Sequence, residues 1–186
     1  MGDLRTIRTY KLLKDSLLEL LSKDSFDNIK VNDICNLAMV HRTTFYSHFA
    51  DKYELLDYAI KDIENDLISD FSKNKFDTAK DFYTALIMNI LNYLGSKKLF
   101  FRNMLTNNYS TGIITVLHNS AITNITDLLE KEEKAGIKFN TPIKIIAEFY
   151  SGAVTSIIMW WLTSNSKISE EDLCDYIVTL IFEEHK

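Results

Sequence analysis

Apolar residues recur every three to four positions along most of this chain, the spacing that places them on one face of an α-helix. The first such stretch covers residues 4–23 and is followed by a polar, turn-like segment. Two short stretches come next, over residues 31–38 and 40–49, with a tight break between them. The pattern therefore predicts one long helix followed by two short ones.

The rest of the chain is predicted to form longer helices, because capping residues stand at the start of several apolar stretches. Asp51 and Glu54 have the spacing of a capping box, and Pro142 suits the first turn of a helix. Thr78 and Ser169 each precede an aspartate by three positions. The further helices are expected near residues 51–71, 78–94, 97–106, 110–134, 142–163 and 169–184. This makes about nine helices.

Composition supports an all-α fold with a small head and a larger body. Proline occurs once and glycine five times in 186 residues, so few residues break helices. Hydrophobic residues make up 46% of the chain, enough for a packed core. We expect a three-helix head over residues 1–50 and a helical-bundle body over residues 51–186.

Nothing in the sequence predicts a membrane or an extracellular location. The N-terminus lacks the layout of a signal peptide, and the longest nearly apolar run, residues 152–162, is too short to cross a bilayer. Cys35 and Cys174 lie within helical patterns and are expected to be buried, unpaired thiols. We therefore expect a cytoplasmic protein with no membrane partner.

The charge of −5 is unfavourable for binding nucleic acid, but its distribution matters more than its total. Residues 1–49 contain seven Lys or Arg and six Asp or Glu, whereas the remaining residues contain fourteen and twenty. The acidic excess thus lies outside the head. Any affinity for DNA must come from a few well-placed groups.

The two short helices make sense as a helix-turn-helix, in which the first braces the second in a major groove. Val40, Phe45 and Phe49 are expected to face inward. The outward face of the second short helix then carries hydrogen-bond donors and no carboxylate that would repel phosphate. Its members are His41, Arg42, Thr43, Thr44, Tyr46, Ser47 and His48.

The run Thr44-Phe45-Tyr46-Ser47-His48-Phe49, followed by Asp51-Lys52, resembles the DNA-binding signature of the TetR family of transcriptional regulators. The similarity extends from about Leu4 to Ile60, and a weaker one covers the stretch from Phe149 to Leu162. It implies a three-helix head, a dimer-forming helical body and usually an effector pocket in that body.

Carried over by position, the resemblance makes Tyr46 and His48 contacts to the DNA backbone and Lys52 a phosphate contact. Arg42 is placed to read base edges, as are Thr43 and Thr44, and an arginine pairs well with guanine. Lys30 is placed to reach a phosphate. The full expected DNA-binding set is Lys30, His41, Arg42, Thr43, Thr44, Tyr46, Ser47, His48 and Lys52.

Each of these residues also has a structural alternative. Tyr46 would fill the gap between two helices, and His48 would be a packed structural histidine. Arg42 would be a solvated residue on an exposed face, and Lys52 would only complement its own helix.

Two residues depart from the family pattern. Met39 stands in the turn where glycine is common, so either a left-handed backbone there costs about 1 kcal/mol or the turn differs slightly from the family pattern. His41 stands where a serine or asparagine cap is usual, so the following helix is expected to be capped less well. Neither departure removes the motif.

The body is rich in aromatic residues, which at helical spacing usually serve packing. If a pocket exists, the helices between residues 51 and 134 are expected to enclose it. Its candidate walls are Met88, Phe101, Met104, Tyr109 and His118. The alternative for His118 is an exposed position on a helix.

Dimerisation is expected because the helix at 142–163 is apolar around more than one face and the last helix carries a similar stripe. The alternative is a purely internal core helix. The expected interface residues are Ile146, Tyr150, Val154, Ile157, Trp161, Tyr176, Ile177 and Leu180.

Together these features predict a DNA-binding transcriptional regulator, a repressor released by a small effector, that binds a palindromic operator as a homodimer. The alternative is a DNA-binding co-regulator whose body docks a protein partner and holds no small-molecule pocket. The sequence contains no phosphate loop, no metal-binding spacing and no recognisable nucleophile–base pair. We therefore expect neither an enzyme nor a bound cofactor or metal.

Overall fold

The computed structural model describes residues 4–69, 76–108 and 112–182, and all the regular structure within them is helical. The prediction of an all-α fold is confirmed. The helices are α1 (Leu4–Leu21), α2 (Val31–Ala38), α3 (Arg42–Tyr46), α4 (Lys52–Ser69), α5 (Ala79–Ser96), α6 (Lys98–Asn107), α7 (Gly112–Lys134), α8 (Ile143–Thr163) and α9 (Glu170–Phe182).

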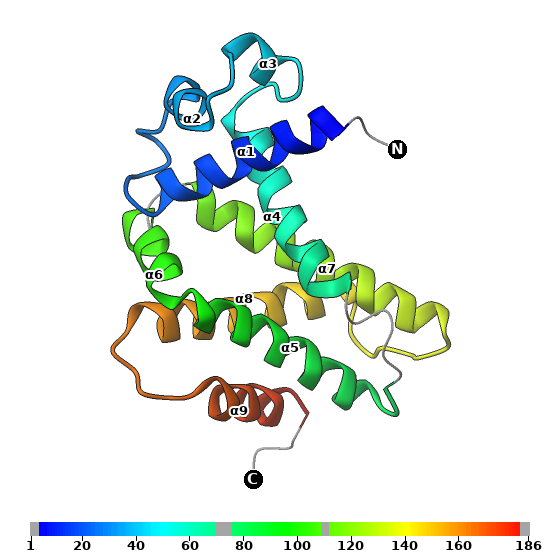
Figure 1. Cartoon of the computed structure of the whole chain (residues 1–186). Coiled ribbons are helices and arrows are strands. Elements are labelled where there is room, and N and C mark those ends of the chain that lie inside the picture. Colours follow the sequence, from blue (N-terminus) through cyan, green and yellow to red (C-terminus); the bar gives the residue numbers. More distant parts are fainter. Residues whose placement is uncertain (1–3, 70–75, 109–111, 183–186) are drawn as a thin grey trace.

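The short helices α2 and α3 lie at one end of the molecule, above α1, and α4 leads from this head into the body (Figure 1). In the body, α7 packs against α8 and α5 packs against α9. Helix α6 contacts both α8 and α1, so it connects the body to the head directly. This connection is additional to the covalent one through α4.

Asp51, Thr78 and Ser169 cap helices as expected. Asp51 Oδ1 accepts hydrogen bonds from the backbone N–H groups of Tyr53 and Glu54 at 2.8 and 2.9 Å. Thr78 Oγ1 accepts one from the N–H of Asp81 at 3.1 Å. Pro142 differs from the prediction, because its extended ψ of 133° makes it the cap residue before α8 and not part of the first turn.

Helix α3 is shorter than the apolar pattern suggests. It ends at Tyr46, and Ser47 follows as its C-cap, so His48 and Phe49 lie beyond the helix. Phe49 is nonetheless buried, as the pattern predicts. Phe49 therefore faces inward from a short loop, although helical spacing had placed it in the helix.

Both cysteines are buried and unpaired, as expected from the sequence. Burial raises the pKa of the Cys35 thiol and of the Cys174 thiol, which disfavours the reactive thiolate. They act as small apolar core residues.

Helix α8 is longer than its most apolar run. By length and composition alone it could cross a membrane. Only 22% of the residues in its most apolar window are buried within the chain. Much of its apolar surface thus lacks cover from the rest of the described protein.

Candidate nucleic-acid interface

The polar face of α3 is held outward by two buried phenylalanines. Phe45 is fully buried, and the Phe49 ring packs 4.9 Å from the ring of Tyr10 in α1 and 5.7 Å from that of Tyr58 in α4. The rings of Phe45 and Phe49 also lie 5.8 Å apart. The head core thereby fixes which side of α3 faces solvent.

The turn before α3 has the backbone that the family pattern requires, without the glycine. Met39 adopts φ 55° and ψ 40°, in the left-handed region, and its side chain is 94% exposed. The expected strain at this position is therefore present. His41 is the N-cap of α3 and makes no side-chain cap hydrogen bond, as expected.

The structure brings four of the predicted DNA-binding residues together around one open depression of about 460 Å³. Lys30, Arg42, Tyr46 and Lys52 line it, alongside other residues that include two aspartates. Arg42 Nη2 donates to the Tyr46 hydroxyl at 3.4 Å, and the guanidinium lies 5.7 Å from the centre of the Tyr46 ring. The ring therefore orients the arginine while leaving the head of its side chain in solvent.

The other predicted residues of the recognition segment, which is residues 41–48, remain accessible. His41, Thr43 and Ser47 are exposed, and Thr44 is partly exposed. Tyr46 is 50% exposed, so it does not simply fill a gap between helices. These positions are compatible with contact to DNA.

His48 packs against α1. Its ring lies edge-on to Tyr10 at 5.1 Å between centres, and the side chain is only partly exposed. This contact ties the end of the recognition segment to α1. The structural alternative for His48 thus has geometric support.

Lys52 makes contacts within the chain, and its phosphate contact stays a prediction. Its Nζ donates to the carbonyl oxygens of Phe26, Asp27 and Ile29 at 2.6, 3.3 and 2.8 Å. An ammonium group has three N–H donors, and the loop between α1 and α2 uses all of them. Partial burial lowers the pKa of Lys52, and the nearby charge of Asp27 opposes this shift.

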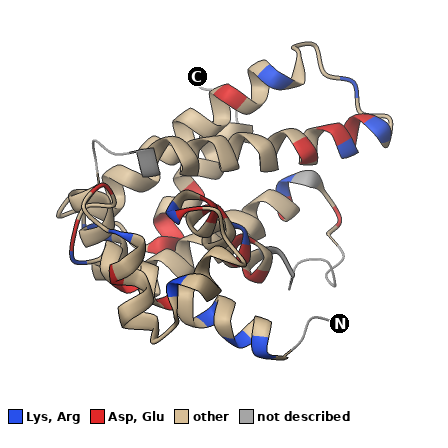
Figure 2. Cartoon of the chain, turned by 90° about the horizontal axis from the view of Figure 1, so that it is seen from above, with Lys and Arg blue, Asp and Glu red and all other residues tan. Residues whose placement is uncertain are grey.

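Sequence reasoning missed a basic surface on α1. Arg5, Arg8 and Lys11 are exposed in the N-terminal half of that helix, where Figure 2 shows Lys and Arg following one another. Tyr10 joins the same half of α1 to His48. The signal was present in the sequence, because four of the seven basic residues in the first 49 positions lie in this helix.

The predicted walls of an effector pocket lie in different surroundings. Phe101 and Met104 are buried in the core, Met88 and His118 are partly buried, and Tyr109 lies outside the described residues. His118 Nδ1 lies 3.4 Å from Ser151 Oγ. That these residues form a pocket stays a prediction.

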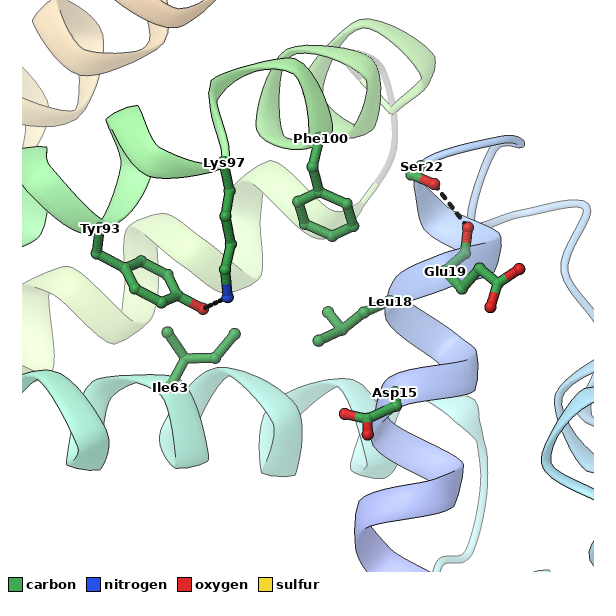
Figure 3. Close-up of a pocket in the computed structure, with 8 residues that line it drawn as sticks. All are labelled: Asp15, Leu18, Glu19, Ser22, Ile63, Tyr93, Lys97 and Phe100. Carbon is green, nitrogen blue, oxygen red and sulfur yellow. Dashed lines mark hydrogen bonds between the residues drawn. The ribbon is translucent and has the colours of Figure 1, made fainter.

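An open cleft of about 330 Å³ lies instead where the head meets the body (Figure 3). Leu18, Ile63 and Phe100 supply its apolar lining, and Lys97 Nζ donates to the Tyr93 hydroxyl at 3.3 Å beside it. Figure 3 shows Asp15 facing this space from α1. The cleft touches α1, α4, α5 and α6, so its contents would affect how these helices meet.

The predicted dimer interface needs correction at two positions. Trp161 and Ile177 are 0% and 1% exposed within a single chain, so they have no surface left for a second chain. Trp161 instead packs inside the body, where its Nε1 donates to the Ile168 carbonyl at 2.9 Å. Helical spacing alone could not tell which side of an apolar helix faces inward.

The remaining interface candidates stay open to contact, and the structure adds others. Tyr176 and Leu180 are exposed on α9, while Ile146, Tyr150, Val154 and Ile157 are partly exposed on α8. The large apolar side chains of α8 that are most exposed were not predicted. They are Ile145, Phe149 and Trp160.

Two family sequence profiles match the chain. One, described as bacterial regulatory proteins of the tetR family, matches residues 15–59. The other, described as a transcriptional regulator C-terminal region, matches residues 81–183, which is more than half of the chain. The two matches fall on the head with the start of α4 and on the body.

Individual relatives agree with these profiles. A transcriptional activator of the dhaKLM operon from Lactococcus lactis is 27% identical over 103 residues, which are 54% of this chain and 50% of that protein. This chain thus matches about half the length of that curated relative.

Solved structures share the fold over nearly the whole chain. A TetR transcriptional regulator from Streptococcus agalactiae has a TM-score of 0.66 at 21% identity, with 95% of each chain covered. A TetR-family regulator from Syntrophomonas wolfei has a TM-score of 0.72 at 17% identity, covering 94% of this chain and 93% of its own. At such identities these likenesses show the fold alone.

Proposed function

The chain belongs to the TetR family of DNA-binding transcriptional regulators, and from this premise we propose that it binds a palindromic operator as a homodimer in the cytoplasm. We further propose that it represses transcription until an effector releases it. The observation that carries the proposal is the exposed polar face of α3. Its residues lie outward on a helix that Phe45 and Phe49 anchor in the core.

The chemistry of this face suits a major groove. Residues 41–48 contain an arginine, two histidines, two threonines, a serine and a tyrosine, and no carboxylate. An exposed arginine can donate two parallel hydrogen bonds to guanine, whereas hydroxyl and backbone N–H groups suit phosphate oxygens. We assign base contact to Arg42, Thr43 and Thr44. Backbone contact falls to Lys30, His41, Tyr46, Ser47 and His48, while Lys52 shapes the neighbouring loop.

A homodimer would cover the apolar surface that one chain leaves open. Phe149 and Trp160 on α8 are 68% and 51% exposed, and Tyr176 and Leu180 on α9 are exposed as well. Exposed apolar surface of this kind marks an interface. Two heads held by such a dimer would meet half-sites whose centres are about 34–36 Å apart, or a multiple of that distance.

The proposed effector would bind in the cleft between the head and the body. The cleft of Figure 3 touches both head and body, so a ligand that fits only one arrangement of these helices would shift the protein towards that arrangement. A small molecule bound there would lower operator affinity by its preference for the non-binding arrangement.

A second candidate function is that of a DNA-binding co-regulator whose body docks a protein partner. The burial of Phe101 and Met104 favours it, because both side chains belong to the packed core of the body. The Lactococcus relative is named as an activator, so the direction of regulation needs its own test. Reporter transcription in a deletion strain should rise for a repressor and fall for an activator.

The test of DNA recognition is the affinity of the purified protein for fragments of its own upstream region, measured by fluorescence anisotropy. Arg42→Ala should weaken specific binding by about 5- to 150-fold for each half-site, and by roughly the square of that factor for a homodimer on both half-sites, and should relax the preference for one base pair per half-site. Arg102→Ala, an exposed arginine on α6, is the matched control and should bind like the wild type. An Arg42→Ala protein with unchanged sequence preference would contradict the assignment.

A further inference from the structure

The head and the body are joined by a buried polar side chain at the end of α6. Asn108 is 0% exposed, although asparagine is usually a surface residue. Its Oδ1 accepts a hydrogen bond from the backbone N–H of Phe26 at 2.6 Å. Its Nδ2 donates to the carbonyl oxygen of Met104 at 2.8 Å and lies 3.5 Å from that of Leu21.

These partners belong to three different segments. Met104 is in α6 itself, Leu21 is the last residue of α1, and Phe26 is in the loop that leads to α2. The amide has only one orientation that satisfies them, since its oxygen must meet an N–H and its nitrogen must meet carbonyls. Asn107 adds a weaker contact to the same region, from Nδ2 to the Ser22 carbonyl at 3.4 Å.

The loop that Asn108 holds is also held from the side of α4. Lys52 donates to the carbonyl of the same Phe26, so the N–H and the C=O of one residue are bonded to two different parts of the protein. The Phe26 ring is buried, 5.0 Å from the Tyr53 ring and 4.5 Å from Lys52 Nζ. The loop therefore has little freedom to move independently of either side.

The loop is connected to α3 through α2. It ends at Lys30, whose N–H donates to Asp33 Oδ2 at 2.9 Å at the start of α2, and α2 packs against α3. On the other side, α6 packs against α8, the helix with the exposed apolar face. A continuous set of packed elements thus runs from α8 through Asn108 to α3.

We propose that Asn108 is a positioning residue that fixes the head on the body and so sets the half-site spacing that the dimer accepts. The inference rests on the proposed homodimeric DNA binding. It assigns Asn108 no contact with DNA. Loss of the side chain should loosen the position of each α3 without changing the groups that α3 presents.

The experiment measures the affinity of the full-length protein for DNA fragments that share the same two half-sites. The fragments have the natural spacing or one or two base pairs more or fewer, and one further fragment carries a single half-site. The wild type should prefer the natural spacing sharply, because one extra base pair both shifts and rotates a half-site. Asn108→Ala should bind the natural site at least tenfold more weakly, with a flattened spacing preference and a half-site affinity within twofold of the wild type.

Asn89→Ala is the matched control, since its Nδ2 donates to the Leu67 carbonyl at 2.8 Å inside the body. It should keep the wild-type spacing profile. A folded Asn108→Ala protein with that same profile, or with an equal loss on the single half-site, would overturn the inference alone. A wild type that binds none of the fragments would overturn the proposed function as well.

If Asn108→Ala does not fold, Asn108→Gln serves instead, because it keeps the amide and lengthens the side chain by one methylene. Amide hydrogen exchange of the wild type supplies a measurement without any variant. The Phe26 N–H should be protected like those of α1, although it lies in a loop. Exchange of this N–H at the rate of exposed loop amides would contradict the proposal.

Discussion

At the scale of single residues, the turn between α2 and α3 contains a methionine in a conformation that favours glycine. Met39 has φ 55°, and its side chain is almost fully exposed, so it gains little from packing. Side chains with a Cβ are strained in this region by about 1–2 kcal/mol, and the greater flexibility of glycine in the unfolded chain offsets part of that.

We predict that Met39→Gly stabilises the protein by about 1 kcal/mol and raises the melting temperature by about 2–4 °C. Thermal unfolding followed by circular dichroism measures this. Asn36→Gly, at an exposed position within α2, is the control and should destabilise, since glycine is unfavourable inside a helix. A destabilised Met39→Gly protein would show that Met39 is not strained in this turn.

Lys52 gives a second prediction, one that separates the structure from the sequence resemblance. If its ammonium holds the loop carbonyls, Lys52→Met should destabilise the protein by about 1–3 kcal/mol, because charge-assisted hydrogen bonds are lost. Urea unfolding measures the loss, and Lys61→Met, at an exposed position on the same helix, is the control. A Lys52→Met protein with unchanged stability and weakened DNA binding would indicate that Lys52 contacts a phosphate instead.

Residue roles were predictable where the local pattern determines them. The inward Phe45 follows from short-range spacing, and the resemblance to the family pattern pointed to the unusual residues Met39 and His41 in and after the turn. Lys52 and Asn108 were not predictable in this way, because the loop residues that they hold lie 23 or more positions away in the sequence. Only the folded chain shows that both residues hold the backbone of Phe26.

At the scale of elements, helix positions were largely predictable and helix faces only in part. Caps such as Thr78 mark where helices begin, and the structure places them within one or two residues of the expected starts. For α8, however, apolar residues surround the helix, so the sequence did not show which of them α6 and α7 bury. Trp161 was therefore assigned to a dimer interface although it fills the core.

The faces of α8 and α9 give a prediction at this scale. Phe149→Glu should weaken dimerisation at least about a hundredfold, because a carboxylate would be buried without a partner in an apolar interface. Sedimentation velocity across a concentration series measures it. Ile137→Glu, at an exposed apolar residue between α7 and α8, should leave the assembly unchanged. A Phe149→Glu protein that remains dimeric would place the interface elsewhere.

At the scale of the whole molecule, the distribution of charge determines how the protein approaches DNA. The chain is acidic overall, yet the head exposes Arg5, Arg8 and Lys11 along α1 as well as Arg42 at the start of α3. Phosphate contacts release counterions, so operator affinity should fall steeply as salt rises. The sequence alone indicated a head that is only slightly basic. The fold shows that α1 and the recognition segment are neighbours.

We predict that Arg8→Gln reduces the slope of log affinity against log salt by about 2, since a homodimer loses one phosphate contact at each head. Titrations at several salt concentrations measure the slope. Lys138→Gln, at an exposed lysine of the body, is the control and should leave the slope unchanged. An Arg8→Gln protein with the wild-type slope would remove α1 from the DNA interface.

The most direct test of DNA reading by the exposed face of α3 is genomic footprinting of the wild type beside Arg42→Ala. We expect the wild type to protect a two-fold symmetric site whose half-site centres lie about one helical turn or a multiple of it apart. We expect Arg42→Ala to lose that protection. A wild type that protects no site, or an Arg42→Ala protein that protects the same site equally well, would contradict this role of α3.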